Sequence, residues 1–214
     1  MKERSIRTLW LSLLMVCFFV AGIFSISMNV KAADTDSSAP EIPGLTFESE
    51  MQNDFAECFH IYYYNDDYTL IDVPDSGQFL LVPEGKTAPD GLDSDIVVLQ
   101  KPLDNIYLAA TSAMSLFSSL DALDNIKFSS LQESGWYVDA AKQAMEDGSI
   151  VFAGKYSEPD YELLVNSDCN LAIESTMILH TPKVQEMIEQ MGIPVLPMPF
   201  YIEDECFYEG RNLT

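Results

Sequence analysis

The sequence predicts an α/β fold, a single three-layer lobe with a mostly parallel sheet flanked by helices and an N-terminal antiparallel β-hairpin. Three observations support this prediction. Between residues 96 and 196, short apolar runs alternate with segments of helical spacing, as in parallel strands joined by helices. Residues 59–82 contain β-forming runs separated by turn residues. Residues 163–195 have the pattern of a helix end, a strand, a polar loop, a helix and a further strand, and ligands of such sheets bind at the carboxyl ends of strands.

The predicted hairpin occupies residues 59–82. Residues 59–64 are rich in β-formers, residues 65–67 (Asn-Asp-Asp) form a turn, residues 68–73 return as a second strand, and residues 78–82 form a third. The tyrosines of the first strand allow two interpretations, a stacking platform for a ligand or cross-strand packing on a half-buried sheet. We favour packing.

The parallel part is predicted from runs of β-branched and apolar residues that alternate with amphipathic segments. Gly192 and Pro194 mark the end of the last helix and the start of a new strand, and Thr181 and Pro182 are expected as the cap and first residue of that helix. The predicted strands are 96–100, 106–109, 126–128, 150–154 and 171–173, and the predicted helices are 112–123, 138–145, 161–164 and 182–191.

The first 32 residues have the pattern of a targeting segment. A basic start precedes an apolar run without charge at residues 9–28, and small residues follow at Val30 and Ala32. This pattern predicts a secretory signal peptide over residues 1–32. The run is also long enough to cross a bilayer, so an uncleaved N-terminal anchor is the alternative.

The rest of the chain divides by composition. Residues 33–46 are small, polar and rich in proline, which predicts a flexible linker. The folded lobe is expected over residues 47–200, and residues 201–214 are expected to be a tail. With 11 Lys and Arg against 34 Asp and Glu, the net charge is -23, which argues against a nucleic-acid partner.

Cysteine and histidine give no sign of a metal or a cofactor. No Cys-x-x-Cys spacing occurs, and the chain has two histidines, so neither a metal site nor a bound cofactor is expected. Cys169 precedes an apolar strand, where a small buried thiol is the usual explanation.

Two loops at predicted strand ends offer polar or aromatic groups. Thr111 and Ser112 stand at a strand-to-helix junction, where they either contact a ligand or cap the helix. Trp136 and Tyr137 lie on a second loop and Tyr156 on the next one, where they either contact an apolar or planar ligand or cover the edge of the core.

The third loop, residues 174–180, is the richest in functional groups. It brings together a carboxylate at Glu174, a hydroxyl at Ser175 and a thioether at Met177. No nucleophile–base pair and no phosphate-binding glycine motif is recognisable, so we expect a binding protein and not an enzyme. Glu174 acting as an acid or base would need a second carboxylate that the spacing does not identify.

Several stretches resemble the first lobe of ABC-transporter substrate-binding proteins for iron-siderophores and cobalamin. The resemblance covers about residues 55–200 and is carried by residues 99–114, 153–162, 171–178 and 192–195. It implies two α/β lobes joined by a long helix, with the ligand held between the lobes and acidic residues docking on a membrane permease. The joining helix and second lobe would follow Val195, so the chain, which ends at Thr214, is expected to supply one lobe only.

By this resemblance, the expected function is capture of a ferric siderophore, haem or a corrinoid outside the cytoplasmic membrane, by a monomer that passes the ligand to an ABC permease. The alternative is a truncated remnant or extracellular interaction domain that keeps the fold without binding. The residues implied to line the ligand cleft are Thr111, Ser112, Trp136, Tyr137, Tyr156, Glu174, Ser175 and Met177, and the candidates for permease docking are Glu186 and Glu189.

Overall fold

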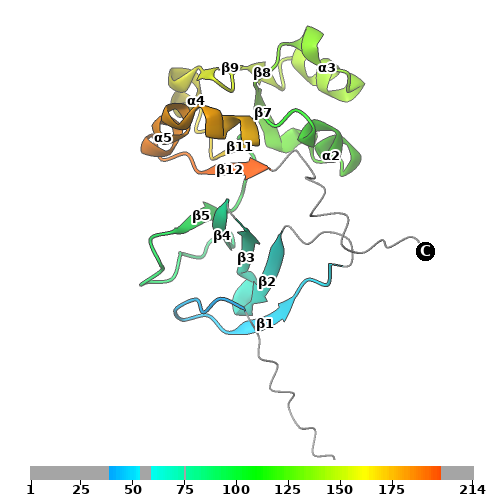
Figure 1. Ribbon diagram of the computed structural model, residues 1–214. Coiled ribbons are helices and arrows are strands. Elements are labelled where there is room, and N and C mark those ends of the chain that lie inside the picture. The colour runs from blue at the N-terminus through cyan, green and yellow to red at the C-terminus, as the bar shows by residue number, and fades with distance from the viewer. Residues whose placement is uncertain (1–38, 54–58, 75, 199–214) are drawn as a thin grey trace, which may run out of the picture. The chain divides into compact units, whose positions relative to one another are not determined.

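The computed structural model describes residues 39–53, 59–74 and 76–198 (Figure 1). The predicted signal peptide or anchor, the first residues of the predicted linker and the predicted tail lie outside these residues. No helix in the described part of the chain has the length and apolar character needed to cross a bilayer.

Two five-stranded sheets carry the fold. The N-terminal sheet has the order β1-β2-β3-β4-β5, in which the first four strands are antiparallel neighbours and β5 lies parallel to β4. The expected hairpin is therefore present and is extended by a strand on each side. Its strands are β1 (Phe47–Glu50), β2 (His60–Tyr64), β3 (Thr69–Val73), β4 (Gly77–Val82) and β5 (Ile96–Gln100).

The position of β5 corrects a sequence-based expectation. Residues 96–100 were expected in the same parallel sheet as the later strands, yet they pair with β4 from Gln78↔Ile96 to Val82↔Gln100. The long connection over residues 83–95 brings the chain back beside β4 in the parallel direction without a helix. A buried apolar run does not by itself say which sheet it joins.

Two of the three tyrosines of β2 pack inside the N-terminal sheet, as favoured from the sequence, whereas Tyr63 is exposed. Tyr62 and Tyr64 are buried, and Phe47 of β1 meets both rings edge to face, with centroids 6.3 and 6.1 Å away. Such aromatic pairs add stabilisation beyond the area they bury. The Tyr64 hydroxyl also donates a hydrogen bond to the Pro40 carbonyl, which ties the start of the described chain to this sheet.

The second sheet is wholly parallel and has the order β12-β11-β6-β7-β8. Asn170 sets the register at its centre. Its backbone N–H donates to the Asn105 carbonyl (3.1 Å), and its side-chain oxygen accepts from the Asn105 N–H (3.2 Å). The strands are β6 (Ile106–Leu108), β7 (Ile126–Ser129), β8 (Val151–Phe152), β11 (Leu171–Ser175) and β12 (Val195–Met198).

Helices cover both faces of this parallel sheet, which confirms the predicted α/β fold (Figure 1). On one face Leu108 and Ile173 belong to the same core cluster as Met114 of α2 and Ala141 of α3. On the other, Tyr107 belongs to the cluster that contains residues of α4 and α5. The helices are α2 (Ala113–Ser119), α3 (Asp139–Glu146), α4 (Tyr161–Asn166) and α5 (Pro182–Gln190).

Helix ends differ in detail from the sequence-based predictions. Helix α2 ends at Ser119, before the predicted end near 123, and Asp121 follows in a left-handed conformation with φ 55°. Neither Ser112 nor Thr181 makes the expected side-chain cap, and the Thr181 hydroxyl donates instead to the Ile178 carbonyl (3.2 Å). Pro182 occupies the first turn of α5, as predicted.

A small hairpin follows β8 and is anchored to the parallel sheet. Its strands are β9 (Gly154–Lys155) and β10 (Glu158–Pro159), and the Tyr107 hydroxyl of β6 donates to the Gly154 carbonyl (3.1 Å). Gly154 has φ +80°, and a Cβ atom there would lie 2.4 Å from the Glu158 carbonyl oxygen. Only glycine therefore fits this position without movement of the backbone.

We expect Gly154→Ala to lower the free energy of unfolding by about 2 kcal/mol or more, because alanine meets both a left-handed backbone and a steric clash. Gly148→Ala is the matched control, since Gly148 has φ +82° with no atom within 4 Å of its added Cβ. The control should lose only about 1 kcal/mol. Urea denaturation followed by circular dichroism measures both, and equal losses would contradict the steric argument.

Candidate functional site

A cavity of about 640 Å³ opens at the carboxyl ends of the parallel strands. We call it the crevice cavity. Its walls come from the segments that follow β6, β7 and β11, from β8 and from the β9–β10 hairpin. The lining residues are Ala109, Thr111, Ser130, Leu131, Gln132, Ser134, Gly135, Phe152, Lys155, Tyr156, Ser175 and Met177.

The cavity lies where the strand order changes direction. Strands β6 and β11 are neighbours, and the backbone N–H groups of Ala109 and Ala110 both donate to the Ile173 carbonyl (2.8 and 3.0 Å). After β6 the chain enters α2 on one face, and after β11 it proceeds to α5 on the other. The two connections diverge and leave a crevice between them, which is where open α/β sheets bind ligands.

Four of the eight residues implied by the resemblance line this cavity, namely Thr111, Tyr156, Ser175 and Met177. Ser112 begins the turn into α2 and is not among the lining residues. The structure therefore brings together one residue from the loop after β6, one from the β9–β10 hairpin and two from the end of β11.

The two aromatic residues expected on the loop after β7 have different surroundings. The Trp136 side chain is 4% exposed, and its indole N–H donates to the Ser129 hydroxyl (3.0 Å). The Tyr137 side chain is 95% exposed and points away from the core. Neither lines the cavity, although Gly135, the residue before Trp136, does. Trp136 is therefore a residue of the buried core.

Glu174 is also displaced from its expected place. The polar loop was expected to begin at residue 174, but β11 continues through Ser175. Alternation along the strand puts Glu174 on the same face as Ala172, which packs toward α4 and α5. Glu174 is 0% exposed, and neither of its carboxyl oxygens has a hydrogen-bond partner among the described residues.

Burial without a partner decides the ionisation of Glu174. Desolvation raises the pKa of Glu174 to about 8, so the carboxyl is largely protonated at neutral pH. Burial, and secondarily the charge of Glu174, raises the pKa of Tyr107 and of Tyr161. Burial raises the pKa of the neighbouring Cys169 thiol to about 11, and Cys169 is buried, as expected from the sequence.

Sequence analysis missed several cavity residues, among them Gln132, Phe152 and Lys155. The loops after the strands at 126–128 and 150–154 were selected from the sequence, but for their aromatic residues Trp136, Tyr137 and Tyr156. The polar residues 130–134 follow the first of these strands directly, and Lys155 follows the second. Their place at the carboxyl ends of the strands is the signal that could have identified them.

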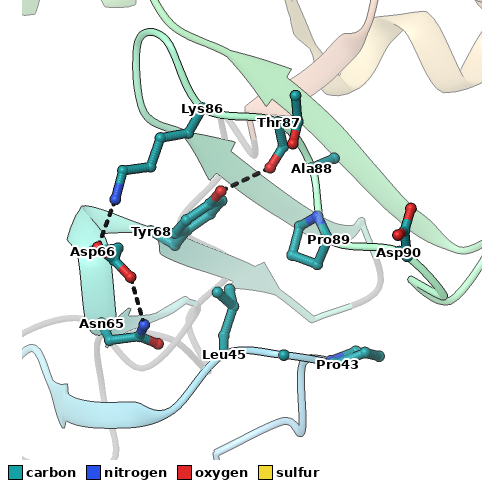
Figure 2. Close-up of a pocket in the computed structure, with 11 residues that line it drawn as sticks. Pro43, Leu45, Asn65, Asp66, Tyr68, Lys86, Thr87, Ala88, Pro89 and Asp90 are labelled. Carbon is teal, nitrogen blue, oxygen red and sulfur yellow. Dashed lines mark hydrogen bonds and ion pairs between the residues drawn. The ribbon is translucent and has the colours of Figure 1, made fainter.

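A second cavity, of about 490 Å³, lies on the N-terminal sheet (Figure 2). Three charged residues of the described chain line it, of which Lys86 and Asp66 form an ion pair and Asp90 is the third. Lys86 Nζ lies 2.7 Å from Asp66 Oδ1, and this contact lowers the pKa of Asp66. Asn65 donates to the other Asp66 oxygen (2.8 Å), and the Tyr68 hydroxyl donates to the Thr87 carbonyl (2.7 Å). The crevice cavity is the better candidate site because it lies at the carboxyl ends of parallel strands, where open α/β sheets bind ligands.

From the sequence we expected no metal site, and we named two glutamates as candidates for docking on a permease. Within residues 39–53, 59–74 and 76–198, no group of three or more His, Cys, Asp or Glu side chains is placed to hold a metal ion. Glu186 and Glu189 are exposed on α5, and Glu189 accepts a hydrogen bond from Gln185 (2.8 Å). Their role in docking stays a prediction. In comparisons with known proteins, neither a protein-family model nor a curated protein matches the chain.

The buried Glu174 carboxyl predicts an unusual dependence of stability on pH. In the unfolded chain Glu174 loses its proton near its ordinary pKa of 4.5, whereas in the folded chain it keeps the proton up to about pH 8. Its contribution to stability is complete below pH 4.5 and is lost as the pH rises to about 8, by at most about 1.4 kcal/mol per pH unit.

Chemical denaturation at several pH values, with the intact chain and Glu174→Gln, isolates this effect. The difference in unfolding free energy between the two proteins should fall with rising pH between 4.5 and 8 and then become flat. Glu189→Gln, on the exposed side of α5, is the control and should show no such slope. A constant difference across this range for Glu174→Gln would contradict a buried, protonated carboxyl.

Proposed function

We propose that this chain is an extracytoplasmic binding lobe of an ABC importer, which captures a metal chelate such as a ferric siderophore, haem or a corrinoid. The observation that carries the proposal is the crevice cavity at the switch point between β6 and β11. Its volume lies in the range of small-molecule sites, and its walls combine apolar side chains with a few polar ones.

The residues that carry the resemblance also surround the cavity. Residues 99–114 supply Ala109 and Thr111, residues 153–162 supply Lys155 and Tyr156, and residues 171–178 supply Ser175 and Met177. Three segments that lie far apart in the sequence thus meet at one site. Their meeting at one cavity supports the proposal that this chain binds a ligand. It favours that proposal over a remnant that keeps the fold without binding.

The chemistry of the walls suits binding without reaction. Hydroxyl and amide groups can orient a ligand, and Phe152, Tyr156 and Met177 offer apolar contact to its body. The buried carboxyl of Glu174 faces the α4 and α5 side of the sheet and is not a wall of the cavity. In this proposal the ligand is bound at the outer face of the cytoplasmic membrane and passed unchanged to a permease.

Calorimetric titration of the purified chain with a ferric siderophore panel, haemin and cobalamin tests the proposal. At least one compound should bind, and Tyr156→Ala should weaken its binding about tenfold or more through loss of a ring from the wall. Tyr137→Ala is the matched control, because Tyr137 is exposed and outside the cavity. Binding should also change the fluorescence of Trp136, a buried residue that follows the lining residue Gly135 in the chain.

Two results would contradict the proposal. Absence of binding by every compound would favour a lobe that has kept the fold without the function. Equal effects of Tyr156→Ala and Tyr137→Ala would place the ligand somewhere other than the crevice cavity.

A further inference from the structure

The lining of the crevice cavity has a charge opposite to that of the chain. The protein carries 34 acidic and 11 basic residues, yet the described residues that line this cavity include no aspartate or glutamate. Lys155 is the single charged residue among these described lining residues. The described lining therefore carries one positive charge within a protein of net charge -23.

We propose that the crevice cavity takes an organic anion, whose oxyanion binds Lys155 and whose apolar body packs against Phe152, Tyr156 and Met177. This inference rests on the proposed function only in taking the crevice cavity as the ligand site. It goes further because it selects among ligands by charge: an anionic chelate is a ligand and a cationic chelate of similar size is not.

The Lys155 ammonium is available to a ligand. The ion pairs between described residues join His60 to Glu50 and Lys86 to Asp66, so Lys155 takes part in neither. Its neighbour across the β9–β10 hairpin is Glu158, and their side chains form no ion pair. A lysine at the edge of a cavity, free of protein carboxylates, is suited to bind a carboxylate, phenolate or phosphate.

The backbone that carries Lys155 is held in place by the sheet. Gly154 has the close approach to Glu158 and Asp160 that no side chain would permit, and its carbonyl accepts the hydrogen bond from the buried Tyr107 hydroxyl (3.1 Å). The backbone of Lys155 is therefore held in place beside the cavity, although its side chain is exposed. Because this backbone is already ordered, less entropy is lost when the Lys155 ammonium binds a ligand.

Further hydrogen-bond donors line the crevice cavity in which we propose that the anion binds. Thr111, Gln132 and Ser134 line the same cavity, and their side chains make no hydrogen bond to another described residue. Hydroxyl and amide groups donate to oxyanions as readily as they do to water. The negative charge of the rest of the protein disfavours binding of anions at unspecific sites, so binding of an anion should depend on Lys155.

The test compares three probes by calorimetric or fluorescence titration of the purified chain. The first is 8-anilinonaphthalene-1-sulfonate, a small aromatic anion. The others are two ferric complexes of similar size, a tris-catecholate with net negative charge and a trihydroxamate that carries a free ammonium group. We expect the first two to bind and the third to bind at least about tenfold more weakly than the tris-catecholate.

Three variants locate the interaction. Lys155→Gln should weaken binding of the two anionic probes about tenfold or more, and Lys155→Arg should restore it to within about threefold of the original chain. Lys183→Gln on α5 removes the same charge at a residue that does not line the cavity and should leave binding unchanged. Thermal unfolding of each variant shows that the fold is kept.

The outcomes separate this inference from the proposed function. If a ferric complex binds and Lys155→Gln has no more effect than Lys183→Gln, chelate capture stands and the anion site is refuted. If only the sulfonate probe binds, and does so through Lys155, the anion site stands and chelate capture fails. Preference for the cationic complex, or binding of none of the three probes, overturns the inference.

Discussion

Strands β6 and β11 lie side by side in the parallel sheet, and the crevice cavity exists because the chain leaves them toward opposite faces. The Ile173 carbonyl accepts hydrogen bonds from the N–H groups of both Ala109 and Ala110, which holds the end of β6 against β11 up to the point of divergence. The walls that follow, from Thr111 on one side and Ser175 on the other, are placed by this pairing. A change of register by one residue would turn the wall residues to the wrong face.

Tyr107 connects the buried side of the parallel sheet to the cavity rim. Its ring lies in the core cluster shared with α4 and α5, and its hydroxyl reaches the Gly154 carbonyl, next to Lys155. Glu174 interacts electrostatically with Tyr107 from the adjacent strand. The protonated state of Glu174 therefore keeps a negative charge away from the hydrogen bond between the Tyr107 hydroxyl and the Gly154 carbonyl of the β9–β10 hairpin. Stability of the core and placement of the lysine depend on the same tyrosine.

Periodicity and turn chemistry predicted the strands at 106–109, 126–128 and 171–173, because each is a short apolar run bounded by breakers. They could not assign Ile96–Gln100 to a sheet, since pairing with β4 depends on tertiary contacts. Nor could they distinguish Trp136 from Tyr137, because adjacent aromatic residues look alike in a sequence. In the structure Trp136 is buried and donates a hydrogen bond to Ser129, whereas Tyr137 is exposed. Glu174 was misplaced because a carboxylate seldom occupies a buried strand.

The contact between Asn105 and Asn170 joins residues 65 positions apart, and it lies at the amino ends of the neighbouring strands β6 and β11. Closing so long a segment costs chain entropy before the pairing of β6 with β11 offsets it. Proteins dominated by such non-local contacts fold slowly, on a scale of about milliseconds to seconds. The helices and strands between β6 and β11 can form early from local contacts. The pairing of β6 with β11 can form only after β11 has reached β6. We therefore expect the crevice cavity to be among the last features to appear as the chain folds.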